Sequence, residues 1–122
     1  MNKPFLENNS SQSLLEEIIQ LAFEKKAQNL ILLDLRGLSY LSDYFIVCNG
    51  TSEPQVKAIV DNIRKGTSFK PKHLEGYTNK KWVLLDYFDI IVHVFDEQGR
   101  NYYAIENIWA DAPKKEFNDE KT

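Results

Sequence analysis

Hydrophobic residues recur at two spacings along this chain, and these spacings separate helices from strands. Ser13 and Glu16 match a helix capping box, and apolar residues repeat every three to four positions after them, which predicts a first helix from Ser13 to about Ala27. Ser52 precedes a second amphipathic segment and can cap a second helix. Gly66 is the expected left-handed stop of that helix.

Strands are predicted where aliphatic and aromatic residues run together between turn residues. The bend between residues 86 and 89 is short, so the strands on either side of it must be antiparallel neighbours. A last short helix is expected over residues 101–109. The predicted order of elements is helix, strand, strand, helix, three strands and helix. This order indicates a two-layer α+β domain, with a mixed sheet of about five strands and flanking helices. The predicted strands cover residues 30–35, 44–49, 74–77, 82–86 and 90–95.

The two ends of the chain are polar or charged and fall outside this pattern. Residues 1–12 are expected to be flexible, and residues 13–112 to form the one folded domain. Residues 113–122 are expected to be a disordered charged tail.

Composition narrows the class of protein. The formal net charge of -3 over 122 residues argues against a protein that coats nucleic acid generally. Cys48 is the only cysteine, which excludes an intrachain disulfide and a cysteine-based zinc cluster. The N-terminus lacks the apolar core of a secretory signal, and the apolar runs are too short to span a membrane. We therefore expect a cytoplasmic protein without a membrane partner.

The most distinctive pattern lies between residues 82 and 109. It reads W-V-L-L-D-Y-x-D-I-I-V-H-V-F and then R-x-Y-Y-x-I-E-x-I-W. Four shorter motifs precede it in order: Asp34-Leu35-Arg36-Gly37-Leu38-Ser39, Asp43-Tyr44-Phe45-Ile46-Val47, Gly50-Thr51-Ser52 and Glu75-Gly76. Together they closely resemble the ribosomal silencing factor family, also called the Iojap-like family, over about residues 13–112.

This resemblance implies a translation repressor that is not an enzyme and needs no cofactor. Such a protein would bind the large ribosomal subunit through large-subunit protein fourteen and sterically block joining of the small subunit. The resemblance also implies a nucleotidyltransferase-like fold.

Nucleotidyl transfer is the rival function, because Gly50-Thr51-Ser52 opens a helix near acids on strands. Acids that share a metal in such enzymes stand two residues apart on one strand, so that both face the same way. Asp86 and Asp89 are three apart across a bend, and no lysine follows Gly50 closely. His93 alternates with apolar residues on one strand face, which favours a core histidine over a metal ligand or general base. We therefore predict no catalytic residues and no metal site.

The strand from residue 82 to 86 supplies the candidate binding residues. Trp82, Leu84 and Asp86 share one face, and this mixture of an aromatic, an aliphatic and an acidic side chain suits an interface. Tyr87 and Phe88 extend it at the bend. From the residues alone, Trp82 and Phe88 could equally cap the core. The resemblance assigns all five to the contact with large-subunit protein fourteen, with Trp82 as the anchor.

The C-terminal motif has a structural interpretation. Arg100, Tyr103, Glu106 and Trp109 are expected to lock the last helix onto the sheet, since an Arg–acid pair and two aromatics can do so without a ligand.

Two further partners stay open. Residues 57–81 hold seven Lys or Arg against two acids, so this basic segment could contact ribosomal RNA phosphates, although a solvated surface explains it too. A homodimer through the aromatic strand or the first helix is also compatible with the sequence. The basic residues considered for the RNA contact are Arg64, Lys65, Lys70, Lys72, Lys80 and Lys81.

Overall fold

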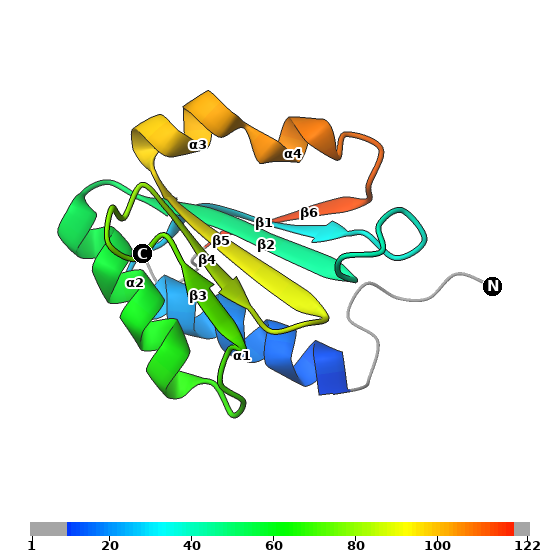
Figure 1. Cartoon of the computed structure of the whole chain (residues 1–122), viewed down its shortest axis with the longest axis horizontal. Coiled ribbons are helices and arrows are strands. Elements are labelled where there is room, and N and C mark those ends of the chain that lie inside the picture. The colour runs from blue at the N-terminus through cyan, green and yellow to red at the C-terminus, as the bar shows by residue number, and fades with distance from the viewer. Residues whose placement is uncertain (1–9, 119–122) are drawn as a thin grey trace.

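A mixed six-stranded sheet forms the centre of the protein (Figure 1). The structure is a computed structural model and describes residues 10–118. The strand order is β3-β4-β5-β2-β1-β6, with β2 and β5 parallel and every other neighbouring pair antiparallel. The strands are β1 (Gln28–Asp34), β2 (Tyr44–Gly50), β3 (His73–Glu75), β4 (Trp82–Asp86), β5 (Ile90–Asp96) and β6 (Lys114–Phe117). The helices are α1 (Ser10–Glu24), α2 (Glu53–Gly66), α3 (Glu97–Tyr103) and α4 (Ile105–Ile108).

Helices cover the two faces of the sheet unequally. The long helices α1 and α2 lie on one face and enclose the larger core, to which Ile18, Ile46 and Ile59 contribute (Figure 1). The short helices α3 and α4 lie on the other face over a smaller core that includes Phe45 and Phe95. The predicted α+β class with a mixed sheet is confirmed, and α3 and α4 add a small layer on the second face.

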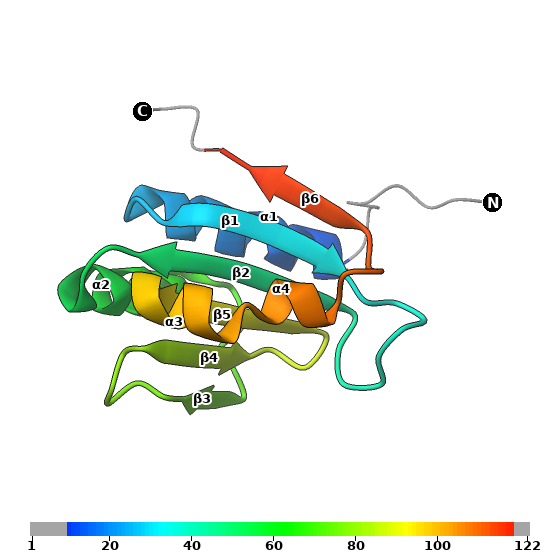
Figure 2. The same cartoon turned by 90° about the horizontal axis from the view of Figure 1, so that it is seen from above.

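Seen from above, α3 and α4 run over the middle of the sheet and leave β3 and β4 uncovered (Figure 2). In agreement with this view, α3 contacts β5 and β2. One face of β4 therefore lies open beside the short helices.

The helix boundaries correct two expectations about caps. α1 begins at Ser10, so Ser13 lies inside the helix and is not its cap. Residues 10–12 are thus helical, whereas residues 1–9 lie outside the described part of the chain. Ser52 does cap α2, because its Oγ accepts a hydrogen bond from the Gln55 N–H at 3.2 Å.

Gly66 is the last residue of α2, but it is not the left-handed stop that was expected. The cap residue is Thr67 in an extended conformation, so the expectation of a left-handed glycine stop is wrong. A Cβ on Gly66 would lie 2.5 Å from Leu21 Cδ2, which shows that the glycine lets α2 approach α1 closely.

The C-terminal region departs most from expectation. The helix predicted over residues 101–109 is two short helices, broken where Ala104 adopts a left-handed conformation with φ 44° and ψ 48°. α3 begins earlier than expected because Asp96 caps it, its Oδ1 accepting from the Gly99 N–H at 2.6 Å.

Strand β6 replaces part of the expected disordered tail. It pairs antiparallel with β1, from Leu33 opposite Lys114 to Leu30 opposite Phe117. The expectation of disorder from residue 113 is therefore wrong for residues 114–117, because pairing along the edge of β1 orders a segment whose charge alone indicates solvation. Residues 119–122 lie outside the described residues.

Candidate functional site

Trp82 stands at the start of β4 and is held by three neighbours. Its ring stacks on Phe95 with centroids 5.1 Å apart, and it packs against Tyr103 at 4.6 Å. Its Nε1–H donates a hydrogen bond to His93 Nδ1 at 3.0 Å. The indole is half-buried. Trp82 therefore caps the smaller core with one side and presents the rest of its ring on the open face.

His93 supports Trp82 from within the smaller core. The side chain is 4% exposed, and the edge of its ring meets Phe45 with centroids 4.5 Å apart. Burial lowers the pKa of His93 to about 3, so the imidazole is neutral at ordinary pH. Because Nδ1 accepts from Trp82, the proton of the neutral ring lies on Nε2, which has no hydrogen-bond partner among the described residues. The prediction of a core histidine is confirmed.

The open face of β4 continues from Trp82 through Leu84 to Asp86. All three are half-buried, while the alternate residues Val83 and Leu85 are fully buried in the larger core. On the neighbouring edge strand, the exposed residues Glu75 and His73 pair with Leu84 and Asp86. The β4 face, defined by Trp82, Leu84 and Asp86, is thus apolar at its centre and acidic along one side.

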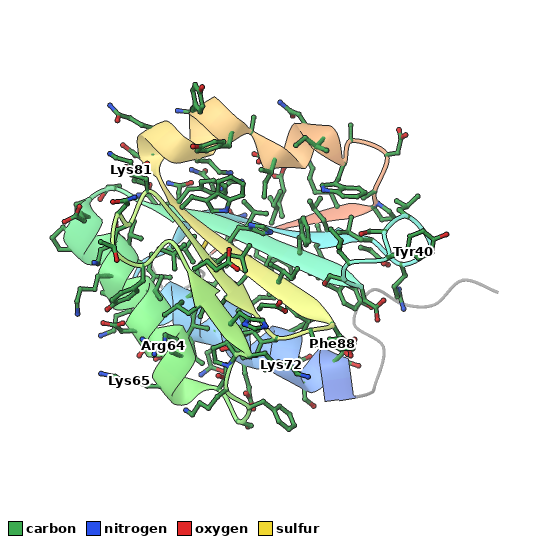
Figure 3. All side chains as sticks on the ribbon, viewed as in Figure 1. Tyr40, Arg64, Lys65, Lys72, Lys81 and Phe88 are labelled. Atoms are coloured by element: carbon green, nitrogen blue, oxygen red, sulfur yellow. The ribbon has the colours of Figure 1, made fainter. Side chains whose placement is uncertain are left out.

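The bend after β4 places one aromatic outside and the other inside. Asp86 Oδ1 accepts from the Phe88 N–H at 2.7 Å, and Phe88 takes a left-handed conformation with φ 78°. Its side chain is 64% exposed, and Lys72 Nζ lies 4.9 Å from the ring centroid. Phe88 and Lys72 lie side by side at this end of the molecule (Figure 3). Phe88 is therefore an exposed aromatic side chain at the end of β4, next in the chain to the β4 face.

Tyr87 does not join this surface. It is 8% exposed and belongs to the larger core on the opposite face of the sheet. Its hydroxyl lies 2.9 Å from Thr67 Oγ1, and desolvation raises the pKa of the phenol. Of the five candidate residues, the structure places Trp82, Leu84 and Asp86 on one face of β4, Phe88 exposed at the bend that follows, and Tyr87 in the larger core.

The C-terminal motif locks α3 and α4 onto the sheet as expected. Arg100 is buried, and it donates to Glu106 Oε2 at 3.1 Å and to Asn49 Oδ1 at 3.1 Å. Trp109 meets the ring of Phe45 edge-on at 6.1 Å. Asn49 was missed by the sequence reasoning, because nothing in the run of β2 marks it as a partner of an arginine in a later helix.

Residues that suggested nucleotidyl transfer make structural contacts, at Asp89 through the backbone. Thr51 and Ser52 bond with Gln55 at the start of α2. The Asp89 carbonyl accepts from Ser42 Oγ at 2.8 Å and ties the loop before β2 to the bend after β4. Within residues 10–118, no group of three or more His, Cys, Asp or Glu residues could hold a metal ion. No helix of the described part is long and apolar enough to cross a membrane.

An α+β fold with a half-exposed aromatic and acidic sheet face points to the class of proteins that act by binding a partner. The family described as "Ribosomal silencing factor during starvation" matches residues 8–122. The chain therefore belongs to the ribosomal silencing factor family, which makes it a ribosome-associated regulator of translation and a binding protein rather than an enzyme.

Individual relatives agree with this assignment. A ribosomal silencing factor RsfS of Halalkalibacterium halodurans is 40% identical over 111 residues, which cover 88% of this chain and 95% of that protein. The RsfS of Bacillus subtilis is 36% identical over 107 residues, covering 85% and 91%. The maize chloroplastic protein Iojap is 34% identical over 93 residues, covering 75% of this chain and 41% of that protein.

Solved structures share the fold. A crystal structure of a Chromobacterium violaceum protein has a TM-score of 0.78 at 31% identity, covering 81% of this chain and 85% of that chain. One from Bacillus halodurans has a TM-score of 0.76 at 38% identity, covering 87% and 99%.

Proposed function

We propose that this protein binds large-subunit protein fourteen through the β4 face and Phe88, and thereby blocks joining of the small ribosomal subunit. Family membership supports the ribosome as the partner. The observation that carries the docking site is the Trp82 indole, held in place by His93, Phe95 and Tyr103 while part of its surface stays open. An aromatic fixed before binding loses little conformational entropy when a partner covers it.

The chemistry of the β4 face indicates the kind of surface it would meet. Leu84 offers an apolar centre, and Asp86 and Glu75 give the side toward β3 a negative charge. The complementary partner surface would have an apolar pocket with a basic rim. We expect this surface on large-subunit protein fourteen.

The proposed action is steric and takes place on cytoplasmic ribosomes. A domain bound to the intersubunit face of the large subunit occupies the space that the small subunit needs, and no bond is made or broken. The block is reversible by mass action, so it depends on the concentration and affinity of the factor.

Trp82→Ala tests the anchor. Truncating a buried interfacial Trp commonly costs about 2 kcal/mol or more, which is roughly a thirtyfold loss of affinity. We expect Trp82→Ala to lose binding to isolated protein fourteen and to large subunits, and to lose the block on subunit joining, as measured by titration and by sedimentation of the joined subunits.

Because Trp82 also packs on the core, a second variant keeps the test decisive. Leu84→Arg places a charge at the centre of the β4 face and keeps His93, Phe95 and Tyr103, the residues that hold Trp82. Tyr40→Ala is the matched control, since Tyr40 is a fully exposed aromatic in the loop before β2, outside the proposed site. Melting and circular dichroism establish that each variant is folded. A folded Leu84→Arg protein with wild-type affinity for protein fourteen would overturn the proposed docking face.

A homodimer through the same face would compete with ribosome binding. Sedimentation of the free protein over a concentration series distinguishes the two. If Leu84→Arg converts a dimer to a monomer and leaves binding to protein fourteen unchanged, the face serves self-association instead.

A further inference from the structure

A group of four positive side chains lies where α2 ends and the chain turns toward β3. Arg64 and Lys65 are in the last turn of the helix, and Lys70 and Lys72 follow in the connection. Together with Pro71, His73 and Leu74 they line a pocket of about 430 Å³. Arg64, Lys65 and Lys72 lie at the same end of the molecule (Figure 3). We call Arg64, Lys65, Lys70 and Lys72 the α2-end cluster.

The structure separates two lysines of the basic segment from this cluster. Lys81 lies at the far end of the molecule from Lys72, and its Nζ is 3.8 Å from Asp96 Oδ2 (Figure 3). Lys57 pairs with Asp61 at 2.8 Å. These lysines have a carboxylate nearby and stand apart from the cluster.

The α2-end cluster has little such compensation, because only Lys65 lies close enough to a carboxylate, that of Asp61, to help lower the pKa of that group. None of its four side chains forms an ion pair with a carboxylate among residues 10–118, and no acid lines its pocket. Four neighbouring cations without an ion pair among the described residues repel one another, although the net charge of the protein is -3. An anion that binds several of them at once would relieve this repulsion, so the cluster fits a ligand with a repeated negative charge.

Local contacts hold the cluster in shape. Lys70 Nζ donates to the carbonyl oxygens of Arg64 and Lys65 at 3.0 and 3.2 Å, which fastens the connection to the end of α2. Lys72 rests over the ring of Phe88, and the Arg64 guanidinium lies 5.8 Å from the ring of Tyr77. Cations supported in this way lose less freedom when they bind phosphate.

Exposed aromatic side chains border the cluster. Phe69, which is 59% exposed, lies in the connection directly before Lys70. Phe88 contacts Lys72 with its ring and Asp86 of the β4 face with its backbone N–H, so it lies between the cluster and that face. Positive side chains beside exposed aromatic rings are typical of surfaces that take RNA phosphates and stack an unpaired base.

We propose that the α2-end cluster binds ribosomal RNA phosphates next to the protein contact, with Phe69 as the stacking platform for an unpaired base. The ribosome as partner follows from the family, and the RNA site does not depend on which ribosomal protein the β4 face meets. The charge of the cluster favours a polyanion over a neutral protein surface. An acidic protein surface is the competing occupant, and the experiment separates the two.

The test uses the triple variant Arg64→Gln, Lys65→Gln, Lys72→Gln, which leaves Lys70 in place to hold the connection. The matched control is Lys25→Gln, Lys81→Gln, Lys115→Gln, which removes the same charge from exposed sites outside the cluster. Binding of the full-length proteins to purified large subunits is measured over a series of KCl concentrations, and binding to isolated protein fourteen is measured alongside.

We expect the triple variant to bind large subunits more weakly. Its slope of log affinity against log salt should be smaller than that of the wild type by about 2–3, because each of the three lost phosphate contacts removes about 0.7–0.9 from it. The control should keep the wild-type slope, and both variants should bind isolated protein fourteen as the wild type does. Phe69→Ala should lose about tenfold in affinity for large subunits with the slope unchanged.

Two results would overturn the RNA site. A triple variant with the same slope as the control excludes phosphate contacts by the cluster. A triple variant that weakens binding to isolated protein fourteen as much as binding to large subunits assigns the cluster to an acidic protein surface. Failure of every protein, wild type included, to bind isolated protein fourteen would refute the protein contact proposed above, while the slope comparison on large subunits would still decide the RNA site.

Discussion

At the scale of single residues, the hydrogen bond between Trp82 and His93 links the candidate site to the protonation of a buried group. The indole N–H can only donate, so His93 Nδ1 must be the unprotonated nitrogen. A proton added there would set two N–H groups against each other in the smaller core. The site is therefore built for the neutral imidazole.

This arrangement predicts a pH dependence of stability. The pKa of His93 falls from 6.5 to about 3 on folding, so below pH 6.5 the unfolded chain takes up a proton that the folded chain does not. The contribution of neutral His93 to the free energy of unfolding is fully present above pH 6.5. It declines as the pH falls toward about 3, with a slope approaching about 1.4 kcal/mol per pH unit. Urea titrations between pH 7 and about 4.5 measure it.

The test variant is His93→Phe, and the control variant is His73→Gln. The slope should largely disappear in His93→Phe and persist in His73→Gln, because His73 is exposed on β3. Asp34 and Asp61 have pKa values lowered from 3.8, so the stability that they contribute is lost at lower pH than this window. An unchanged slope in His93→Phe would refute the assignment to His93.

Strand alternation predicted the open face of β4 correctly, and it could have predicted more. Trp82, Leu84 and Asp86 share a face because side chains alternate along a strand. The same rule, continued one residue, places Tyr87 with Val83 and Leu85 in the core, where the structure has it. The hydrogen bond from Trp82 to His93 could not be predicted from the sequence, because it depends on the register of β4 and β5 that sets Leu84 opposite His93.

At the scale of elements, β6 shows where local pattern stops being informative. Lys114, Lys115 and Glu116 are exposed charged residues, and nothing in this segment indicates a buried strand. Edge strands are commonly charged, and their pairing is set by the strand beside them. Ala104 is a similar case, because alanine favours helix yet here it breaks one.

Deleting residues 114–122 should therefore expose the edge of β1. We expect a loss of about 2 kcal/mol or more in the free energy of unfolding, since the ladder hydrogen bonds and the packing of Phe117 disappear. Amides of β1 that pair with β6 should exchange hydrogen faster, and the protein should aggregate more readily. Deleting residues 119–122 alone is the control. Equal stability of the two truncated proteins would show that β6 contributes nothing.

At the scale of the whole molecule, the class of fold followed from the order of elements, but the arrangement of the sheet did not. β2 and β5 are parallel neighbours at its centre although α2, β3 and β4 lie between them in the chain. Periodicity identifies strands and does not say which distant strands pair, because pairing depends on contacts that close long loops.

Cys48 reports on the integrity of this centre. It lies in β2, between β1 and β5, is fully buried, and burial raises the pKa of its thiol to about 12. A thiol reagent at pH 8 should react with the folded protein only as fast as the molecule opens, and should react fully in denaturant. Variants that destabilise the fold should react faster, in proportion to the population of open molecules. Rapid, complete labelling of the folded wild type would contradict the buried position of Cys48.

The division of β4 between two faces has a consequence for redesign. Val83 and Leu85 pack in the interior while Leu84 and Asp86 lie at the surface, so adjacent positions in one short strand have different surroundings. A library that varies positions 84, 86 and 88 could change which partner the protein recognises while the interior is left intact. Trp82 is the exception, since it packs inward as well, and a new specificity would have to be built around it.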